Sequence, residues 1–261
     1  MAALATVPAG MPAGRAGAEG ATILITTTTE QAMPFEVDTK DCTGLSDGEL
    51  SELADLCAER EPGFDIGFLS KQREEWVLVT EVREGAKLRG YLFGTLERIG
   101  GTPSLLIGVA SVDRTVKAEQ AMRAMMGDQY RRALLAFPDE DVLVGTRLMA
   151  PQGFRALGGL ADVVPRPGHK ATGEERAWGR RLAKRFGAEG RIDDRTFVLA
   201  GDEGPAGAVD LDGPKVTVPD QSLVGLFEGV NLSKGDRLVV FGWAMAEDLA
   251  SGALAAGRAK R

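Results

Sequence analysis

The pattern of apolar and polar positions predicts that the folded part of the chain begins with a strand followed by a helix. The strand is predicted at 35–37. The helix begins at Ser46, which forms an S-x-x-E capping box with Glu49. Its apolar side chains recur at helical spacing, at Leu50, Leu53, Ala54 and Cys57. Because Cys57 belongs to this apolar face, we interpret it as a core residue rather than as a reactive thiol.

A run of strands and a long helix follow. Residues 105–112 are nearly all apolar, which is typical of a central strand that is buried on both faces. An apolar stripe at helical spacing predicts a long helix over about 116–137. The other elements predicted here are strands at 76–82, 88–99 and 142–148, a turn at 100–103 and a short helix at 151–157.

The pattern changes beyond residue 164. Thr172 and Glu175 form a second capping box, and the helix that it opens runs to about residue 186 and ends at Gly187. Further elements are predicted as strands at 196–199 and 238–243 and as a short apolar helix or strand at 223–227. A stretch rich in Gly, Pro and Asp, 201–221, separates the two strands.

This order of elements predicts an α/β (α+β) fold, with a central mixed, mostly antiparallel sheet flanked by helices and with a C-terminal extension. Residues 1–32 are mostly Ala, Gly, Pro and Thr, so they cannot offset their own ordering entropy and are predicted to be a disordered tail. We expect a single domain over 33–261, with a core at 34–165 and a C-terminal helix and strands at 166–261.

Composition narrows the classes of protein and of site. The 261 residues are 44% hydrophobic with a net charge of -7, as in an ordinary soluble globular protein. Because no apolar run approaches the ~18 to 20 residues that span a bilayer, and no signal-like start is present, we expect a cytoplasmic protein without a membrane span. The only cysteines and histidine are Cys42, Cys57 and His169, which excludes a disulfide scaffold, a zinc finger and a metal site with two His ligands.

Charge is distributed unevenly along the chain. Residues 30–61 hold ten acidic and two basic side chains, whereas 166–191 hold eight basic and three acidic ones. A basic helix at 173–186 on an acidic protein is a candidate docking surface for an anionic partner, and the alternative is a solvated helix face. Nucleic acid is disfavoured as that partner, because the whole chain is acidic and no basic stripe is interleaved with aromatic residues.

The most informative stretch is 108–122, where the predicted buried strand runs into the long helix. Such a junction commonly binds anions, because the first helical N–H groups are unpaired and the helix dipole adds positive potential. Arg114 and Lys117 lie at this junction. They are candidate phosphate ligands, with solvated residues at a helix start as the alternative.

The order of elements resembles the GNAT fold of acyl-CoA-dependent N-acyltransferases over roughly 34–165. Family members carry a strand valine, an Arg or Gln five residues later that opens R/Q-x-x-G-x-G/A, and a leucine eight residues further on. Val109, Arg114 and Met122 fall at these spacings, while Lys117 and Glu119 stand at the glycine positions. The resemblance implies a coenzyme A pyrophosphate held at this loop. The cofactor-binding residues would be Val109, Ser111, Arg114, Lys117 and Ala118.

The missing glycines affect which acyl donor the resemblance implies. A β-carbon at both positions crowds a diphosphate, and Glu119 adds like charge. Acyl-homoserine lactone synthases and long-chain N-acyl amino acid synthases resemble this fold, take acyl groups from carrier proteins and have loops that are poorer in glycine. The donor is therefore either acyl-CoA or the phosphopantetheine thioester of an acidic acyl carrier protein, which could dock on the basic helix 173–186.

Candidate catalytic groups are fewer than in typical family members. The family's tyrosine, which protonates the leaving thiolate, is replaced by Phe154, and Tyr130 is a conceivable substitute although a packed core residue is the alternative. Glu97 is the candidate general base, because it lies near where the family often places such a carboxylate, with Glu81 and Asp113 as rivals. No metal is required.

Two hypotheses follow from these residues. The first is an N-acyltransferase that moves an acyl group from a pantetheine thioester to a small-molecule amine, mainly by holding both in the groove beside the 105–112 strand. The second is a catalytically inactive GNAT-like module that binds a ligand or another protein. The retained spacing favours the first hypothesis, whereas the missing glycines and tyrosine favour the second.

Overall fold

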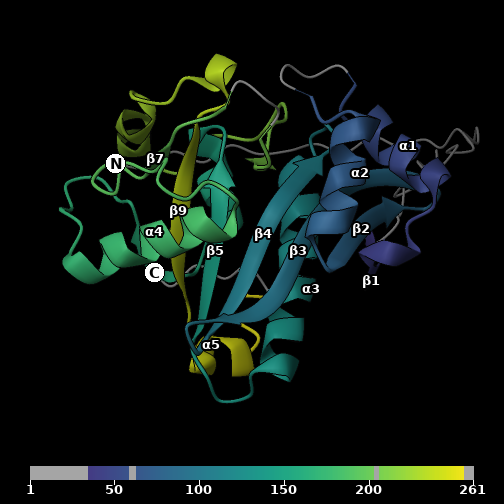
Figure 1. The fold of residues 1–261 in the computed structure, drawn as a ribbon. Coiled ribbons are helices and arrows are strands. Elements are labelled where there is room, and N and C mark those ends of the chain that lie inside the picture. Colours follow the sequence, from purple (N-terminus) through teal and green to yellow (C-terminus); the bar gives the residue numbers. More distant parts are fainter. Residues whose placement is uncertain (1–34, 59–62, 203–205, 256–261) are drawn as a thin grey trace, which may run out of the picture. The chain divides into compact units, whose positions relative to one another are not determined.

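The central feature of the structure, a computed structural model that describes residues 35–58, 63–202 and 206–255, is one mixed sheet (Figure 1). Within these residues the sheet has nine strands. They are β1 (Phe35–Asp41), β2 (Leu78–Glu84), β3 (Lys87–Ile99), β4 (Thr102–Val112), β5 (Val142–Leu148), β6 (Ala161–Val164), β7 (Val198–Leu199), β8 (Val209–Asp210) and β9 (Arg237–Ala244).

Their order is β1-β2-β3-β4-β8-β5-β9-β6, and β7 also pairs with β9. The pairs among β4, β8 and β5 are parallel, whereas all others described are antiparallel. Strand β4 is the buried central strand that its apolar run predicts: every residue after its first is buried. The predicted fold class, a mixed, mostly antiparallel sheet flanked by helices, is confirmed.

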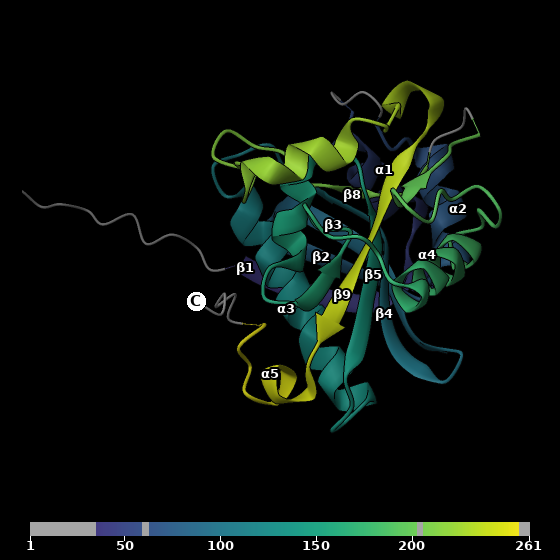
Figure 2. The same ribbon diagram turned by 90° about the vertical axis from the view of Figure 1, so that its left-hand side faces the viewer.

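Helices cover both faces of the sheet. The helices are α1 (Asp47–Asp55), α2 (Ile66–Glu75), α3 (Ala118–Ala136), α4 (Gly173–Arg185) and α5 (Ala246–Ala250), with 3₁₀ turns η1 (Cys42–Gly44), η2 (Pro151–Leu157), η3 (Gln221–Phe227) and η4 (Leu232–Lys234). Figures 1 and 2 show α1, α2 and α4 on one face and α3 on the other. Both predicted capping boxes form, at Ser46 for α1 and at Thr172 for α4.

Helices α2 and α5 and strands β6 and β8 were absent from the sequence prediction. Helix α2 was missed because its apolar face is narrow, with Phe68 and Leu69 beside a buried Gln72, although Asp65 caps it by accepting from Phe68 N. Strand β8 was missed because it is two residues long and lies in the stretch rich in Gly, Pro and Asp. The predicted disordered tail, 1–32, lies outside the described residues.

The core lies between the sheet and its helices. Cys57 is 1% exposed, which confirms its assignment to the core. Trp76 fills the space between α2 and the sheet, its ring centroid 6.2 Å from that of Phe186 at the end of α4. In the described part of the chain, no helix combines the length and the apolar character that crossing a bilayer requires.

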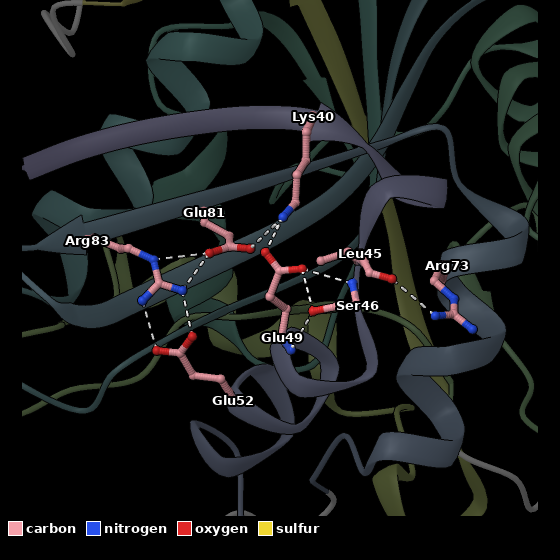
Figure 3. A network of polar contacts seen from close by, with 8 residues as sticks. All are labelled: Lys40, Leu45, Ser46, Glu49, Glu52, Arg73, Glu81 and Arg83. Carbon is pink, nitrogen blue, oxygen red and sulfur yellow. Dashed lines mark hydrogen bonds and ion pairs between the residues drawn. The ribbon is translucent and has the colours of Figure 1, made fainter.

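A polar network fastens α1 to the edge of the sheet (Figure 3). The Arg83 guanidinium on β2 donates to both carboxylate oxygens of Glu52 at 2.8 and 2.6 Å and to Glu81 at 2.8 Å. Lys40 on β1 forms an ion pair with Glu49, whose pKa is lowered to about 2 by the bonds from Lys40 and from the Ser46 backbone. The bond from Arg83 likewise lowers the pKa of Glu52.

Replacing Arg83 by methionine is expected to lower the free energy of unfolding at pH 7 by about 1 to 2 kcal/mol, since it leaves the buried Glu81 with a weaker partner. Because the pKa of Glu52 is lowered on folding, the contribution of the pair is present above the ordinary carboxyl pKa of 4.5 and is lost as the pH falls through the folded value. Urea unfolding at pH 7 and at about pH 3 should therefore show the difference between wild type and R83M shrinking in acid.

The matched control is Arg73→Met. Arg73 contacts the side chain of Asp47, which is 92% exposed. R73M should therefore lower the free energy of unfolding by about 0.5 kcal/mol or less at either pH. A difference between R83M and wild type that is the same in acid as at pH 7 would contradict the assignment of Glu52 as the titrating partner.

Candidate functional site

The sheet opens between β4 and β5. The two strands pair only at their first residues, from Ser104 opposite Leu143 to Leu106 opposite Gly145. Beyond this point, side chains of β5 bridge the two strands. Thr146 Oγ1 donates to the Ile107 carbonyl oxygen at 2.9 Å, and the Arg147 guanidinium donates to the Gly108 carbonyl. The resulting gap is where the family resemblance implies the acyl donor groove.

A β-bulge at Gly108 shapes the near side of this gap. Register on β3 passes from Val109, opposite Phe93, directly to Ile107, opposite Gly94, so Gly108 has no partner there. A bulge bends its strand and re-aims the local carbonyl groups. Gly108 also lies against the ring of Trp76, where a Cβ atom would be 1.9 Å from the nearest ring carbon. The bulge is therefore compatible only with glycine in this packing.

Strand β8 occupies the gap. Val209 stands in register with Ala110 of β4 on one side and with Leu148 of β5 on the other. The Ala110 N–H donates to the Ala208 carbonyl at 3.1 Å. Ala208 is fully buried and Val209 is 2% exposed. The chain's own backbone thus takes the hydrogen bonds that the splayed edge of β4 offers.

The segment after β8 crosses the start of α3, where the phosphate site was predicted. Arg114 Nε forms an ion pair with Asp212 at 3.1 Å. A Cβ atom on Gly213 would lie 2.8 Å from both Ala118 Cβ and the Thr115 carbonyl. The backbone at Gly213 therefore packs directly against the first turn of the helix.

The other predicted cofactor-binding residues are engaged elsewhere. Lys117 is the N-cap residue of α3 and makes an ion pair with Glu84. Val109 is fully buried, and Ser111 Oγ accepts from the Cys57 thiol at 3.2 Å. These residues at the junction of β4 and α3 are thus in contact with other segments of the same chain.

Glu97 lies at the other end of the sheet from this junction. It stands in register with Ser104 at the start of β4, seven residues before Ser111, which corresponds to roughly 23 Å along a strand. Its carboxylate accepts from Arg185 Nε at 2.8 Å. The rival carboxylates are also paired: Glu81 within the α1 network, and Asp113 with Arg89 at 2.7 Å.

Tyr130 lies on α3 inside the protein. Burial raises the pKa of its phenol, and its hydroxyl has no hydrogen-bond partner among the described residues. Tyr130 lines a mostly apolar cavity of about 230 Å³ together with Met122 and Phe154, two positions that the family pattern singled out. Leu211, just after β8, forms another wall. The structure thus brings these three predicted positions together and leaves Glu97 apart.

A second cavity, of about 320 Å³, was not anticipated. It lies between α2, the end of α4, β5 and β9, and is lined by Gln72, Arg147, Phe186, Arg191 and Arg237 among others. Arg147 is 5% and Arg237 1% exposed, and no carboxylate of the described residues lies within ion-pair distance of either. Burial lowers the pKa of Arg147 to about 10, which leaves it charged at neutral pH. Arg147 within one apolar run and Arg237 at the start of another were the sequence signal that could have revealed this cavity.

Within the described residues, no group of three or more His, Cys, Asp or Glu side chains is placed to hold a metal ion.

Comparison with known proteins gives structural likenesses only. No protein-family model matches the chain, and no curated protein sequence does so. The crystal structure of TTHA1254 from Thermus thermophilus is 14% identical with a TM-score of 0.29, covering 41% of this chain and 74% of that one. The ribosomal-protein-S18-alanine N-acetyltransferase from Escherichia coli is 10% identical with a TM-score of 0.36, covering 53% of this chain and 86% of that enzyme. Likenesses at this level assign no function, which must therefore be argued from the site.

Proposed function

We propose that this protein is a GNAT-like ligand-binding module without acyltransferase activity. The observation that carries the proposal is the position of β8 between β4 and β5, where Val209 pairs with both strands. A groove that holds a donor thioester must leave the edge of β4 free for it. Here that edge is occupied by a buried segment of the same chain.

Acyl-CoA and the phosphopantetheine thioester do not fit the residues of the gap. The Ala110 N–H already donates to Ala208, and the backbone of Val209 lies between the strands, in register with Ala110 and with Leu148. At the start of α3, Arg114 is paired with Asp212, and Lys117 and Glu119 add β-carbons where a diphosphate would approach the backbone. With β8 in place, the gap is therefore not a donor groove.

The positions of the candidate catalytic groups also disfavour acyl transfer. A general base must come within hydrogen-bond reach of the proton that it removes. Glu97 is paired with Arg185 and lies roughly 20 Å along the sheet from Ala110, where β8 occupies the gap, and the Tyr130 hydroxyl is buried. Neither side chain is placed to exchange a proton with a substrate between β4 and β5.

The alternative is the N-acyltransferase, which one observation favours: the spacing of Val109, Arg114 and Met122 is intact at the junction of β4 and α3. That function requires β8 to leave the gap before acyl-CoA or a carrier protein binds. A carrier protein would dock on the basic helix 173–186, where Arg180, Lys184 and Arg185 are already paired with carboxylates of this chain.

Acyl transfer and donor binding can be measured directly. We expect that acetyl-CoA, a long-chain acyl-CoA and an acylated carrier protein leave the melting temperature unchanged and release no thiol when mixed with the protein and a panel of amines. Arg114→Ala is the matched variant, since it removes one of the two cations predicted to bind phosphate. Saturable thiol release by the wild type that is weakened in R114A would overturn the proposal and establish the acyltransferase.

A further inference from the structure

Two buried arginines, Arg147 and Arg237, line the cavity between α2, β5 and β9, and neither forms an ion pair with a carboxylate of the described residues. We propose that this cavity binds a small molecule carrying a carboxylate or phosphate group, held by the guanidinium groups of Arg147 and Arg237. This inference rests on the proposed function in one respect, since it names the ligand class of the binding module. Anion binding itself does not depend on whether the protein transfers acyl groups.

Both arginines point to the same side of the sheet. Leu148 on β5 is opposite Leu238 on β9, and Arg147 is opposite Val239. Arg147 and Arg237 are therefore diagonal neighbours on one face, about 7 to 8 Å apart at the backbone. Two long side chains at this separation can direct their guanidinium groups at one ligand.

Most of their hydrogen-bond donors are unused. A guanidinium has five N–H donors. Arg147 donates to the Gly108 carbonyl at 3.2 Å, and Arg237 donates to the carbonyls of Asp236 and Ala206 at 2.7 and 3.3 Å. The Nε atom of each is buried without any partner. Because a buried charged donor left unpaired is costly, these groups call for an acceptor that the described part of the chain does not supply.

The neighbouring carboxylates do not provide this acceptor. Asp202 is paired with Arg191 at 3.0 Å, and Glu97 with the nearby Arg185. The Asp236 carboxylate accepts from the backbone N–H groups of Gly201 and Asn231. Glu75 lines the cavity at its exposed rim, where its charge attracts the Arg147 guanidinium but lies outside ion-pair distance of it. A positive charge therefore remains at the buried end of the cavity.

The walls hold the guanidinium of Arg147 in place. It lies over the ring of Phe186, with Cζ 4.4 Å from the ring centroid, and its Nη2 is close to the backbone at Gly207. A stacked guanidinium presents a rigid fork of donors that matches two oxygens of a carboxylate or phosphate. With about 320 Å³ available, the cavity suits a small metabolite rather than a macromolecule.

Binding can be tested on the full chain with inorganic phosphate, acetate, succinate and citrate at constant ionic strength, with sodium chloride as the reference. We expect saturable calorimetric binding of at least one of these anions. We also expect a rise in melting temperature of about 3 °C at ten times its Kd. Phosphate binding alone would identify a phosphate ligand, and binding of the organic anions a carboxylate ligand.

Arg147→Met and Arg237→Met keep an unbranched apolar side chain and remove the guanidinium, and each is expected to weaken binding by about tenfold or more. Arg98→Met is the matched control, because Arg98 lies at the turn between β3 and β4 and pairs with Glu140. Should a methionine variant fail to fold, Arg237→Lys retains the charge but loses the fork and should still weaken binding. Protection of Arg147 and Arg237 from phenylglyoxal by the anion, mapped by peptide mass, needs no variant.

Anion effects that equal those of sodium chloride, or affinities unchanged in both methionine variants, would overturn the anion site. Failure of the proposed function has a different signature. Thiol release from an acyl donor would refute the proposal of an inactive module and leave the anion site standing. Absence of anion binding without any thiol release would refute the anion site alone.

Discussion

Replacing Gly108 by alanine is expected to lower the free energy of unfolding by about 3 kcal/mol. The added Cβ would lie 1.9, 2.2 and 2.3 Å from three ring atoms of Trp76. That ring cannot move aside, because its Nε1 donates to Gln72, it packs against Phe186 and the guanidinium of Arg185 lies over it at 4.9 Å. Urea unfolding followed by circular dichroism measures the effect.

The control is the same substitution where space is available. A Cβ on Gly173, at the first position of α4, would meet no atom within 4 Å, so G173A should change the free energy of unfolding by about 0.5 kcal/mol or less. If G108A and G173A unfold at the same urea concentration, the bulge does not hold Trp76 as described. The expected loss of stability in G108A is large because one added methyl group would disturb the packing of Trp76 between the sheet, α2 and α4.

Replacing Val209 by aspartate is expected to lower the free energy of unfolding by about 3 to 5 kcal/mol, because it places a charge without a partner in the middle of the sheet. Val209 is 2% exposed, and β8 separates β4 from β5 at this point. Urea unfolding measures the loss. Limited proteolysis with peptide mass mapping should in addition show faster cleavage near residue 209, since β8 leaves the gap first.

Val224→Asp is the matched control, because Val224 on η3 is 45% exposed and tolerates a charge. The two functional hypotheses differ in what V209D does. In the ligand-binding module β8 is a permanent part of the sheet, so the variant is unstable and remains inactive with acyl donors. A V209D protein as stable as V224D that releases thiol from acyl-CoA would instead identify β8 as a removable segment and support the acyltransferase.

Elements set by local interactions were predictable from the sequence. The capping boxes at Ser46 and Thr172 join residues three positions apart, and both form as predicted. Strand β5 matches its predicted range, 142–148, because its apolar run begins directly after the polar segment 138–141 and ends shortly before Pro151. Helix α2 was missed because its many polar residues hide the helical spacing of its apolar side chains. Its burial depends on packing over the sheet, which the local sequence does not indicate.

The candidate site was predictable only in part. The spacing of Val109, Arg114 and Met122 pointed to the junction of β4 and α3, and the structure places Met122, Tyr130 and Phe154 around one cavity. Nothing in the spacing indicated that Arg114 would pair with Asp212, which lies far away in the chain. The predicted basic surface on α4 is likewise reduced, because Arg180 and Arg185 are paired with carboxylates of other segments.

The sequence by itself determined the order of the main strands and helices, their caps and the apolar core, because periodicity and capping act over a few neighbouring residues. Only the tertiary structure decided what the site is. A two-residue strand has no pattern of its own, and β8 exists because β4 and β5 diverge and offer it hydrogen bonds. In the same way, Arg147 and Arg237 lie far apart in the sequence, each beside apolar residues of its strand. The pairing of β5 with β9 places them side by side in one cavity.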